Sequence, residues 1–150
     1  MKLVKHLKDQ GIPVAVATSS HRKAFDLKSS QNGELFCLFD EIICGDDVEI
    51  KKGKPAPDIF LAAAKRLGHE LRDCSDCLVF EDAPSGVLAG LNAGMHVCWV
   101  HDINMSVDDD LRSRVKECIH TMELFGELCL FSEYTHSIYV DPVKFGLPHF

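Results

Sequence analysis

Apolar runs and helical patterns alternate along the first hundred residues. Short apolar runs bounded by turn residues predict buried strands, and apolar positions at helical spacing predict helices. The segments expected to be strands are 12–17, 39–44, 77–80 and 95–100. The segments expected to be helices are 1–10, 20–29, 58–67 and 84–92. Strands that alternate with helices predict an α/β fold, a Rossmann-like parallel sheet with flanking helices.

The pattern weakens after His101. Asp108, Asp109 and Asp110 are expected to cap a helix that runs through Cys118, whereas residues 119–140 are apolar and aromatic with few turn signals. We therefore divide the chain into a core domain over 1–105 and a C-terminal segment over 106–150, whose structure the sequence does not define. Gln31–Gly33 is expected to be a turn.

Composition restricts the class of protein. A chain of 150 residues with 46% hydrophobic residues is expected to form one globular unit. A net charge of −7 argues against a nucleic-acid partner. No apolar run approaches the length of a membrane span, and the N-terminus is too polar for a signal peptide, so we expect a cytoplasmic protein. The pattern leaves the oligomeric state open.

The cysteines fit a reducing compartment. There are seven, an odd number, which argues against a disulfide framework. Cys74 and Cys77 form a Cys-x-x-Cys pair, but a zinc site needs two further ligands and no second pair exists. We expect these two residues to be surface thiols at the start of a strand.

Candidate phosphate-binding groups follow the first strand. Open parallel sheets bind ligands beyond the carboxyl ends of their strands. Thr18 and Ser19 come directly after the first apolar run, so the Thr18 hydroxyl and the Ser19 amide are placed to meet a phosphate oxygen. The alternative is a simple N-cap of the next helix, which the motif alone favours.

Charged groups occupy two comparable positions further along. Lys54 lies beside Pro55 at the start of the expected helix from residue 58, where an ammonium would offset phosphate charge. Glu81 and Asp82 end the third strand, and two buried carboxylates there are costly unless a cation or hydrogen bonds stabilise them. The alternatives are a solvated basic loop for Lys54 and a helix cap for Asp82.

Together these motifs resemble those of the haloacid dehalogenase-like hydrolases, mostly Mg-dependent phosphatases with an aspartate nucleophile. Gly53-Lys-Pro-Ala-Pro-Asp58 and Phe80-Glu-Asp-Ala-Pro84 are similar to the subgroup of pseudouridine-5′-phosphatases and beta-phosphoglucomutases. The resemblance covers about residues 1–105, with a second, weak match at residues 145–148. It implies that Thr18 and Ser19 bind phosphate, that Lys54 bridges phosphate and nucleophile, and that Asp82 ligates Mg²⁺ with Glu81 in support.

The family's first motif is missing from the expected place. An Asp-x-Asp pair should precede Thr18, but Asp9 is the sole carboxylate among residues 1–17. Asp108 and Asp110 have the same spacing as the aspartates of that motif, but they follow no apolar strand. Without a positioned nucleophile we expect no turnover of a small phosphorylated metabolite and only weak Mg²⁺ binding. A non-catalytic binding or regulatory fragment and a sugar-phosphate mutase remain alternatives.

The same resemblance predicts a gap in the sheet. In the family the nucleophile strand lies at the centre, between the strands that end at Thr18 and Glu81, and a helical cap follows it. Losing that strand would expose two apolar edges, with poor solubility as the consequence. Three arrangements would repair the sheet: the neighbours pair directly, a partner chain supplies a strand, or a C-terminal segment such as Ser137–Val140 inserts.

Overall fold

A computed structural model describes residues 2–68, 74–104, 106–119 and 137–140 of the chain. Its helices are α1 (Lys2–Asp9), α2 (Arg22–Ser29), α3 (Gly33–Phe36), α4 (Asp58–Arg66), α5 (Pro84–Asn92) and α6 (Asp109–Arg114), with a 3-10 turn η1 (Ser30–Asn32). Its strands are β1 (Val14–Thr18), β2 (Glu41–Cys44), β3 (Cys77–Glu81), β4 (His96–Val100), β5 (Glu117–Ile119) and β6 (Ser137–Val140). Strands and helices alternate, so the α/β prediction is confirmed.

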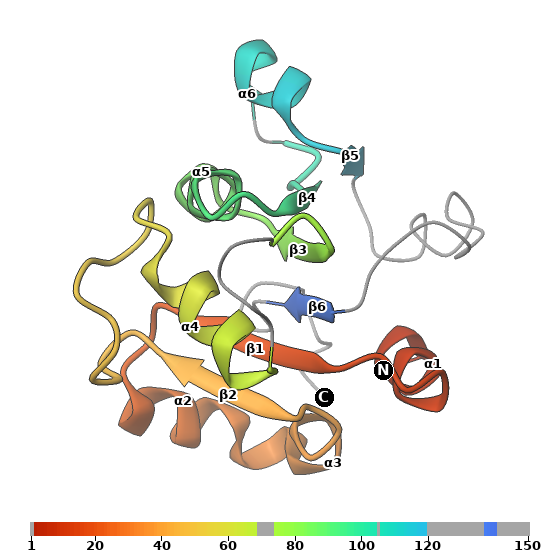
Figure 1. Ribbon diagram of the computed structural model, residues 1–150, viewed down its shortest axis with the longest axis vertical. Helices are drawn as coiled ribbons and strands as arrows, with labels where there is room; N and C mark the ends of the chain where they lie inside the picture. Colours follow the sequence, from red (N-terminus) through yellow and green to blue (C-terminus); the bar gives the residue numbers. More distant parts are fainter. Residues whose placement is uncertain (1, 69–73, 105, 120–136, 141–150) are drawn as a thin grey trace.

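The strands form one six-stranded sheet in the order β2-β1-β6-β3-β4-β5 (Figure 1). All five neighbouring pairs run parallel. The carboxyl ends of the strands therefore meet at one edge of the sheet, which is where a parallel sheet places its ligand.

Strand β6 comes from the far end of the chain and lies at the centre of the sheet. Val140 aligns with Val16 of β1 on one side and with Phe80 of β3 on the other. Of the three arrangements expected for the gap between β1 and β3, insertion of Ser137–Val140 is the one observed. Because β6 pairs with both neighbours, it satisfies backbone groups that an open gap would leave exposed.

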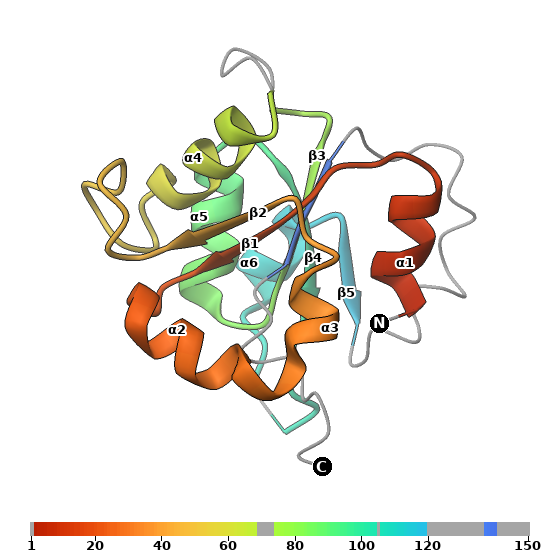
Figure 2. The same cartoon turned by 90° about the horizontal axis from the view of Figure 1, so that it is seen from below.

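Side chains alternate across the sheet and build a core on each face. On one face α4 and α5 cover residues such as Ala15 and Val79, and on the other α1 covers Val14 and Leu78. Figure 2 shows α1 and α4 on opposite sides of the sheet. A third small cluster places Phe25 of α2 against the second face. Buried strands with apolar residues on both faces are typical of parallel sheets.

Two details of the predicted elements differ. The turn expected at Gln31–Gly33 is the 3-10 turn η1, which leads directly into α3, a helix the sequence pattern did not predict. Helix α6 ends at Arg114 rather than Cys118, because β5 begins at Glu117 and pairs with β4. The cap itself is confirmed, since the Asp108 carboxylate accepts a hydrogen bond from the Leu111 amide at 2.8 Å.

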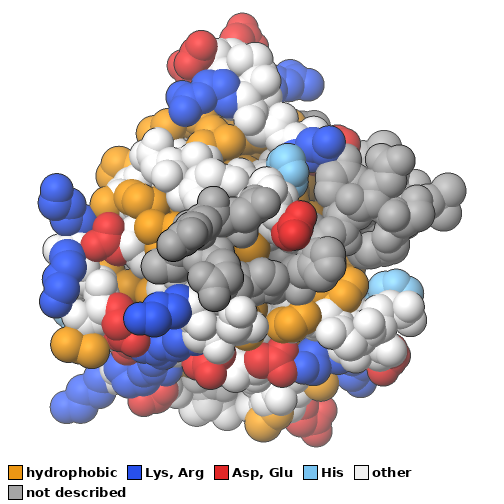
Figure 3. Space-filling view, in the orientation of Figure 1, with side chains coloured by type: hydrophobic (Ala, Val, Ile, Leu, Met, Phe, Trp, Pro, Cys, Tyr) orange, Lys and Arg blue, Asp and Glu red, His pale blue; other side chains and the backbone are white. Residues whose placement is uncertain are grey.

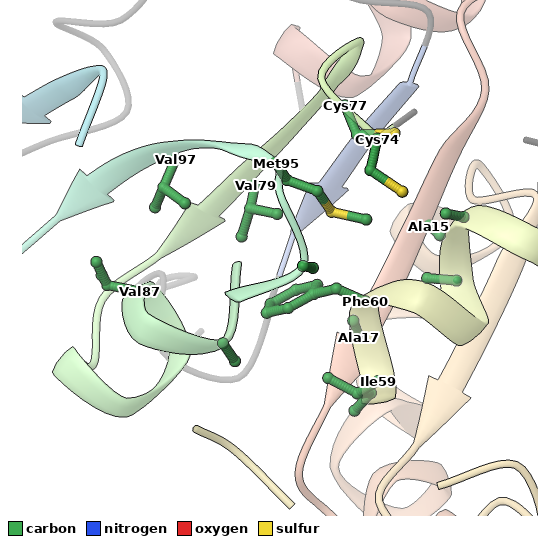
Figure 4. Close-up of a cluster of buried hydrophobic side chains, with 14 of the residues drawn as sticks. Ala15, Ala17, Ile59, Phe60, Cys74, Cys77, Val79, Val87, Met95 and Val97 are labelled. Atoms are coloured by element: carbon green, nitrogen blue, oxygen red, sulfur yellow. The ribbon is translucent and has the colours of Figure 1, made fainter. Parts of the chain in front are cut away.

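The expectation of surface thiols is wrong. Cys74 and Cys77 are both buried, and both belong to the core beneath α4 and α5. Figure 4 shows them in the same cluster as Val79 and Met95. A small apolar thiol packs well in such a core, so the Cys-x-x-Cys pair has a packing role. Within the described ranges no helix has the length and hydrophobicity that a membrane span requires.

Candidate active site

The site begins where β1 and β3 reach the carboxyl edge. Alternation along β3 turns Cys77 and Val79 toward α4 and α5, so Glu81 faces the same side. Thr18, at the end of β1, lies two residues after Val16, so its side chain points to the same face of the sheet. That face is the one against which Phe25 of α2 packs. Both side chains are 1% exposed, which makes them the polar ends of otherwise apolar strands.

Lys54 connects these two strands. Its ammonium donates to the Ala17 carbonyl of β1 at 3.1 Å and forms an ion pair with the Glu81 carboxylate of β3. Strand β6 ends at Val140, opposite Val16 of β1 and Phe80 of β3. The Lys54 ammonium therefore joins β1 and β3 one residue beyond the end of β6. The lysine thus reaches the ligand edge, and the interpretation as a solvated loop residue is wrong.

Lys54 is buried and also lies against an aromatic ring. The side chain is 6% exposed, and its ammonium lies 5.0 Å from the centre of the Phe60 ring. In Figure 4 Phe60 points from α4 into the middle of the core cluster. A cation over a buried aromatic face is stabilised by the ring quadrupole. The lysine is therefore held from three directions, by a carbonyl, a carboxylate and an aromatic face.

Glu81 depends on a close approach by helix α5. A Cβ atom built on Gly86 would lie 2.0 to 2.5 Å from the three atoms of the Glu81 carboxyl group. Any larger residue at this position would displace the carboxylate from its place beside Lys54. Pro84 begins α5, as expected for a proline in the first turn, and brings Gly86 over the end of β3.

The turn after β1 is organised around Thr18. Its hydroxyl oxygen accepts a hydrogen bond from the Ser20 amide at 3.2 Å. The residue that caps α2 is His21, and it makes no side-chain cap bond, so the N-cap interpretation of Thr18 and Ser19 is wrong. The hydroxyl shapes its own turn at the ligand edge, a local bond that threonine makes readily.

Asp82 follows the third strand directly. The Trp99 indole of β4 donates to its backbone carbonyl at 2.9 Å, which fixes the chain as it leaves β3. Ala83 is the N-cap of α5, so the capping interpretation of Asp82 is also wrong. Carboxylate oxygens are the donors that Mg²⁺ prefers, and Glu81 and Asp82 bring two carboxyl groups to the end of β3. The donor chemistry at this strand end is compatible with magnesium.

Sequence reasoning missed three supporting groups. The Ala17 carbonyl and the Phe60 ring both contact the Lys54 ammonium, and Gly86 makes room for Glu81. All three lie outside the quoted motifs Gly53–Asp58 and Phe80–Pro84, although each is close to one of the predicted site residues in the sequence. Nothing in the local pattern states which atoms touch across the sheet. Asp9 ends α1 at the amino side of β1, away from the ligand edge.

A parallel α/β sheet that carries a buried lysine–carboxylate pair and a hydroxyl turn at its carboxyl edge is compatible with binding of an anionic ligand there. Residues 1–94 match the haloacid dehalogenase-like hydrolase family. The chain belongs to that family. The family model describes hydrolases, and proteins of this family generally use Mg²⁺.

Similar proteins support this assignment. The chain is 50% identical over 106 residues to (DL)-glycerol-3-phosphatase 2 of Arabidopsis thaliana, covering 71% of this chain and 44% of that protein. It is 41% identical over 150 residues to a "probable pseudouridine-5′-phosphatase" of Drosophila melanogaster, covering 99% and 57%. The chain thus spans about half the length of these relatives. The second match includes the C-terminal segment that the sequence pattern left undefined.

A solved structure agrees with the fold. A haloacid dehalogenase family hydrolase of Deinococcus radiodurans, with bound phosphate and sodium, superimposes with a TM-score of 0.70 at 25% identity. The superposition covers 83% of this chain and 54% of that one. The central parallel sheet is therefore shared by proteins that contain a longer chain.

Proposed function

We propose that this chain provides the phosphate-binding part of a haloacid dehalogenase-like phosphatase site for a small phosphomonoester. The observation that carries the proposal is the Lys54 ammonium, which joins the Ala17 carbonyl to the Glu81 carboxylate at the carboxyl edge. A buried ammonium held there has little freedom to reorient, so it is preorganised to offset phosphate charge.

The other residues take complementary roles. The Thr18 hydroxyl and the Ser19 amide bind phosphoryl oxygens from the β1 side, and Lys54 binds them from the α4 side. Asp82 would hold Mg²⁺, with Glu81 in support through its pair with Lys54. Bound magnesium supplies positive charge that stabilises the phosphoryl oxygens. With few protein ligands available we expect its affinity to be weak, because Mg²⁺ gives up its waters reluctantly.

The substrate class follows from the relatives' names. One is called a glycerol-3-phosphatase and another a probable pseudouridine-5′-phosphatase. Both names describe hydrolysis of a phosphate ester on a small polar alcohol. A sugar-phosphate mutase would use the same phosphate contacts, and its distinction from a phosphatase lies in cap residues outside these motifs.

Phosphate binding is the direct test. Titration of the chain with inorganic phosphate, followed by amide chemical shifts, should perturb Thr18, Ser19 and Ser20 first. Lys54→Met should weaken binding about tenfold, the loss expected for one charged hydrogen bond. Lys52→Met is the matched control, because Lys52 is exposed in the same loop. Equal effects of the two variants would contradict the proposal.

Turnover is tested separately. We expect no Mg-dependent hydrolysis of glycerol 3-phosphate or pseudouridine 5′-phosphate by residues 1–150, because no Asp-x-Asp pair precedes Thr18. A rate of about 1 per second or faster would contradict this expectation if mutation of a residue within the chain abolished it. A rate that survived all such mutations would indicate a contaminating phosphatase.

A further inference from the structure

Something must set the distance between the two proposed phosphate-binding elements. The Thr18–Ser20 turn follows β1, whereas Lys54 lies in the loop before α4, far away in the sequence. Binding a single phosphate with both requires that they be held at a defined separation, since misplacement of about 1 Å is costly. The turn after β2 contacts the first of these elements directly, and Asp47 bonds it to the end of α4, the helix that follows the Lys54 loop.

That turn packs against the serines. The Gly45 amide donates to the Ser20 carbonyl at 3.0 Å. A Cβ atom on Gly45 would lie 2.6 Å from the Ser19 carbonyl oxygen, so only glycine allows this approach. The backbone of Ser19 and Ser20 therefore rests directly on the turn after β2, and any shift of that turn moves the serines.

Asp47 anchors the same turn to two helices. Its carboxylate accepts hydrogen bonds from Arg22 at 3.1 Å and from Arg66 at 3.0 Å. Arg22 begins α2, directly after the serine turn, and Arg66 ends α4, the helix that follows the Lys54 loop. The Cys44 amide also donates to this carboxylate at 3.3 Å. Figure 3 shows the mixture of acidic and basic side chains at the lower left, where Figure 1 places α2 and the loop to α4.

A metal site is the competing explanation for this cluster. Cys44, Asp46 and Asp47 offer one ligand atom each within 4.8 Å of one another. Burial raises the pKa of the Cys44 thiol to about 11, so in the metal-free protein this thiol stays protonated. Asp47 is already neutralised by two guanidinium groups, and Asp46 accepts the Arg22 amide at 2.8 Å. The cluster is an ion-pair junction.

We propose that Asp47 is a positioning residue, which through Arg22 and Arg66 sets the separation of the Ser19–Ser20 backbone from the Lys54 ammonium. The proposal rests on the proposed function, because it concerns the same phosphate site. Asp47 itself touches neither element that binds phosphate. Its side chain is 14% exposed, so its two charged bonds are shielded and directional.

The test compares two carboxylates that share Arg66. Asp47→Asn keeps the shape and removes the charge, and Glu49→Gln does the same at a residue that binds Arg66 at 2.9 Å in the adjoining loop. We expect Asp47→Asn to weaken inorganic phosphate binding about tenfold, whereas Glu49→Gln changes it less than about twofold. Arg22→Lys, which keeps the charge but loses the fork geometry, should give an intermediate loss.

A second readout separates this inference from the proposed function. In phosphate-free protein, Asp47→Asn should shift the Ser19 and Ser20 amides and the Lys54 side-chain signals, whereas Glu49→Gln should leave them in place. If the wild-type chain bound no phosphate while these shifts still moved, the function would fail and the positioning role would stand. Unmoved shifts and unchanged phosphate affinity in both Asp47→Asn and Arg22→Lys would overturn the inference.

Discussion

The two sides of the site are held in place by different kinds of interaction. On the β1–β2 side the serine turn rests on the turn after β2, which the partly exposed ion pairs of Asp47 with Arg22 and Arg66 hold in place. On the β3–β4 side the carboxylates are held by burial, with Gly86 against Glu81 and Trp99 bonded to the carbonyl of Asp82. The first side depends on partly exposed ion pairs, and the second depends on close packing.

This difference predicts how each side responds to change. Ion pairs near the surface contribute little each to stability, and they weaken with salt. Buried pairs and close approaches tolerate almost nothing, because a removed partner leaves a charge in an apolar site. Lys54 belongs to both sides, since it contacts β1 through Ala17 and β3 through Glu81. Substitutions should therefore have their largest effects around Lys54 and Glu81.

The largest effect should come from Lys54→Met. The Glu81 carboxylate is 1% exposed, so loss of the ammonium should cost about 3–5 kcal/mol of unfolding free energy. The double variant Lys54→Met with Glu81→Leu should recover most of that loss, because it buries no charge. Urea unfolding of both single variants and the double variant measures the coupling. Losses that simply add would show that the pair is not a buried ion pair.

Gly86→Ala should have the next largest effect. The new Cβ would clash with the Glu81 carboxyl, so we expect a loss of about 1–3 kcal/mol despite the better helix propensity of alanine. Gly53→Ala is the control, because a Cβ there meets nothing within 4 Å. Thermal melts of both proteins provide the measurement, and equal melting temperatures would refute the close-packing interpretation.

A smaller effect is expected from Arg66→Gln on the other side. Its pairs with Asp47 and Glu49 are partly exposed, so the variant should lose about 1 kcal/mol at low salt. The loss should shrink in about 1 M NaCl, where screening is strong, while the Lys54→Met loss should persist. Unfolding curves at two salt concentrations decide this. A salt-independent loss for Arg66→Gln would remove the contrast between the two sides.

The smallest effect concerns Asp40, just before β2. Burial acts to raise the pKa of Asp40, but hydrogen bonds from Lys8 and the Val14 amide outweigh it, so the pKa lies below its ordinary value. A lowered folded-state pKa stabilises the protein above the unfolded-state pKa, and this contribution disappears as the pH falls through the folded-state value. The side chain is 36% exposed, so we expect less than about 1 kcal/mol.

The test of Asp40 is a stability profile in acid. Asp40→Asn should flatten the loss of unfolding free energy between about pH 5 and pH 2. Asp26→Asn, at an exposed residue of α2, is the control for the loss of one negative charge. If Asp40→Asn keeps the wild-type slope, the Lys8 and Val14 contacts do not act on its titration.

Most of the fold could be predicted from local patterns. Valine-rich runs such as 14–17 gave β1, and Pro84 marked the start of α5, because strand and helix signals are properties of neighbouring residues. The errors fell where tertiary contacts override local signals. Helix α3 follows an apparent turn, and Cys74 and Cys77 are buried where α4 and α5 pack on the sheet, which the residues around them do not indicate.

For the site, the sequence by itself determined which chemical groups come at strand and helix ends: the hydroxyl of Thr18, the ammonium of Lys54 and the carboxylates of Glu81 and Asp82. Only the tertiary structure decided their partners. The Lys54–Glu81 pair joins residues 27 positions apart, and β6 reaches the centre of the sheet from the far end of the chain. Such contacts depend on packing between distant segments, and periodicity within one segment carries no information about them.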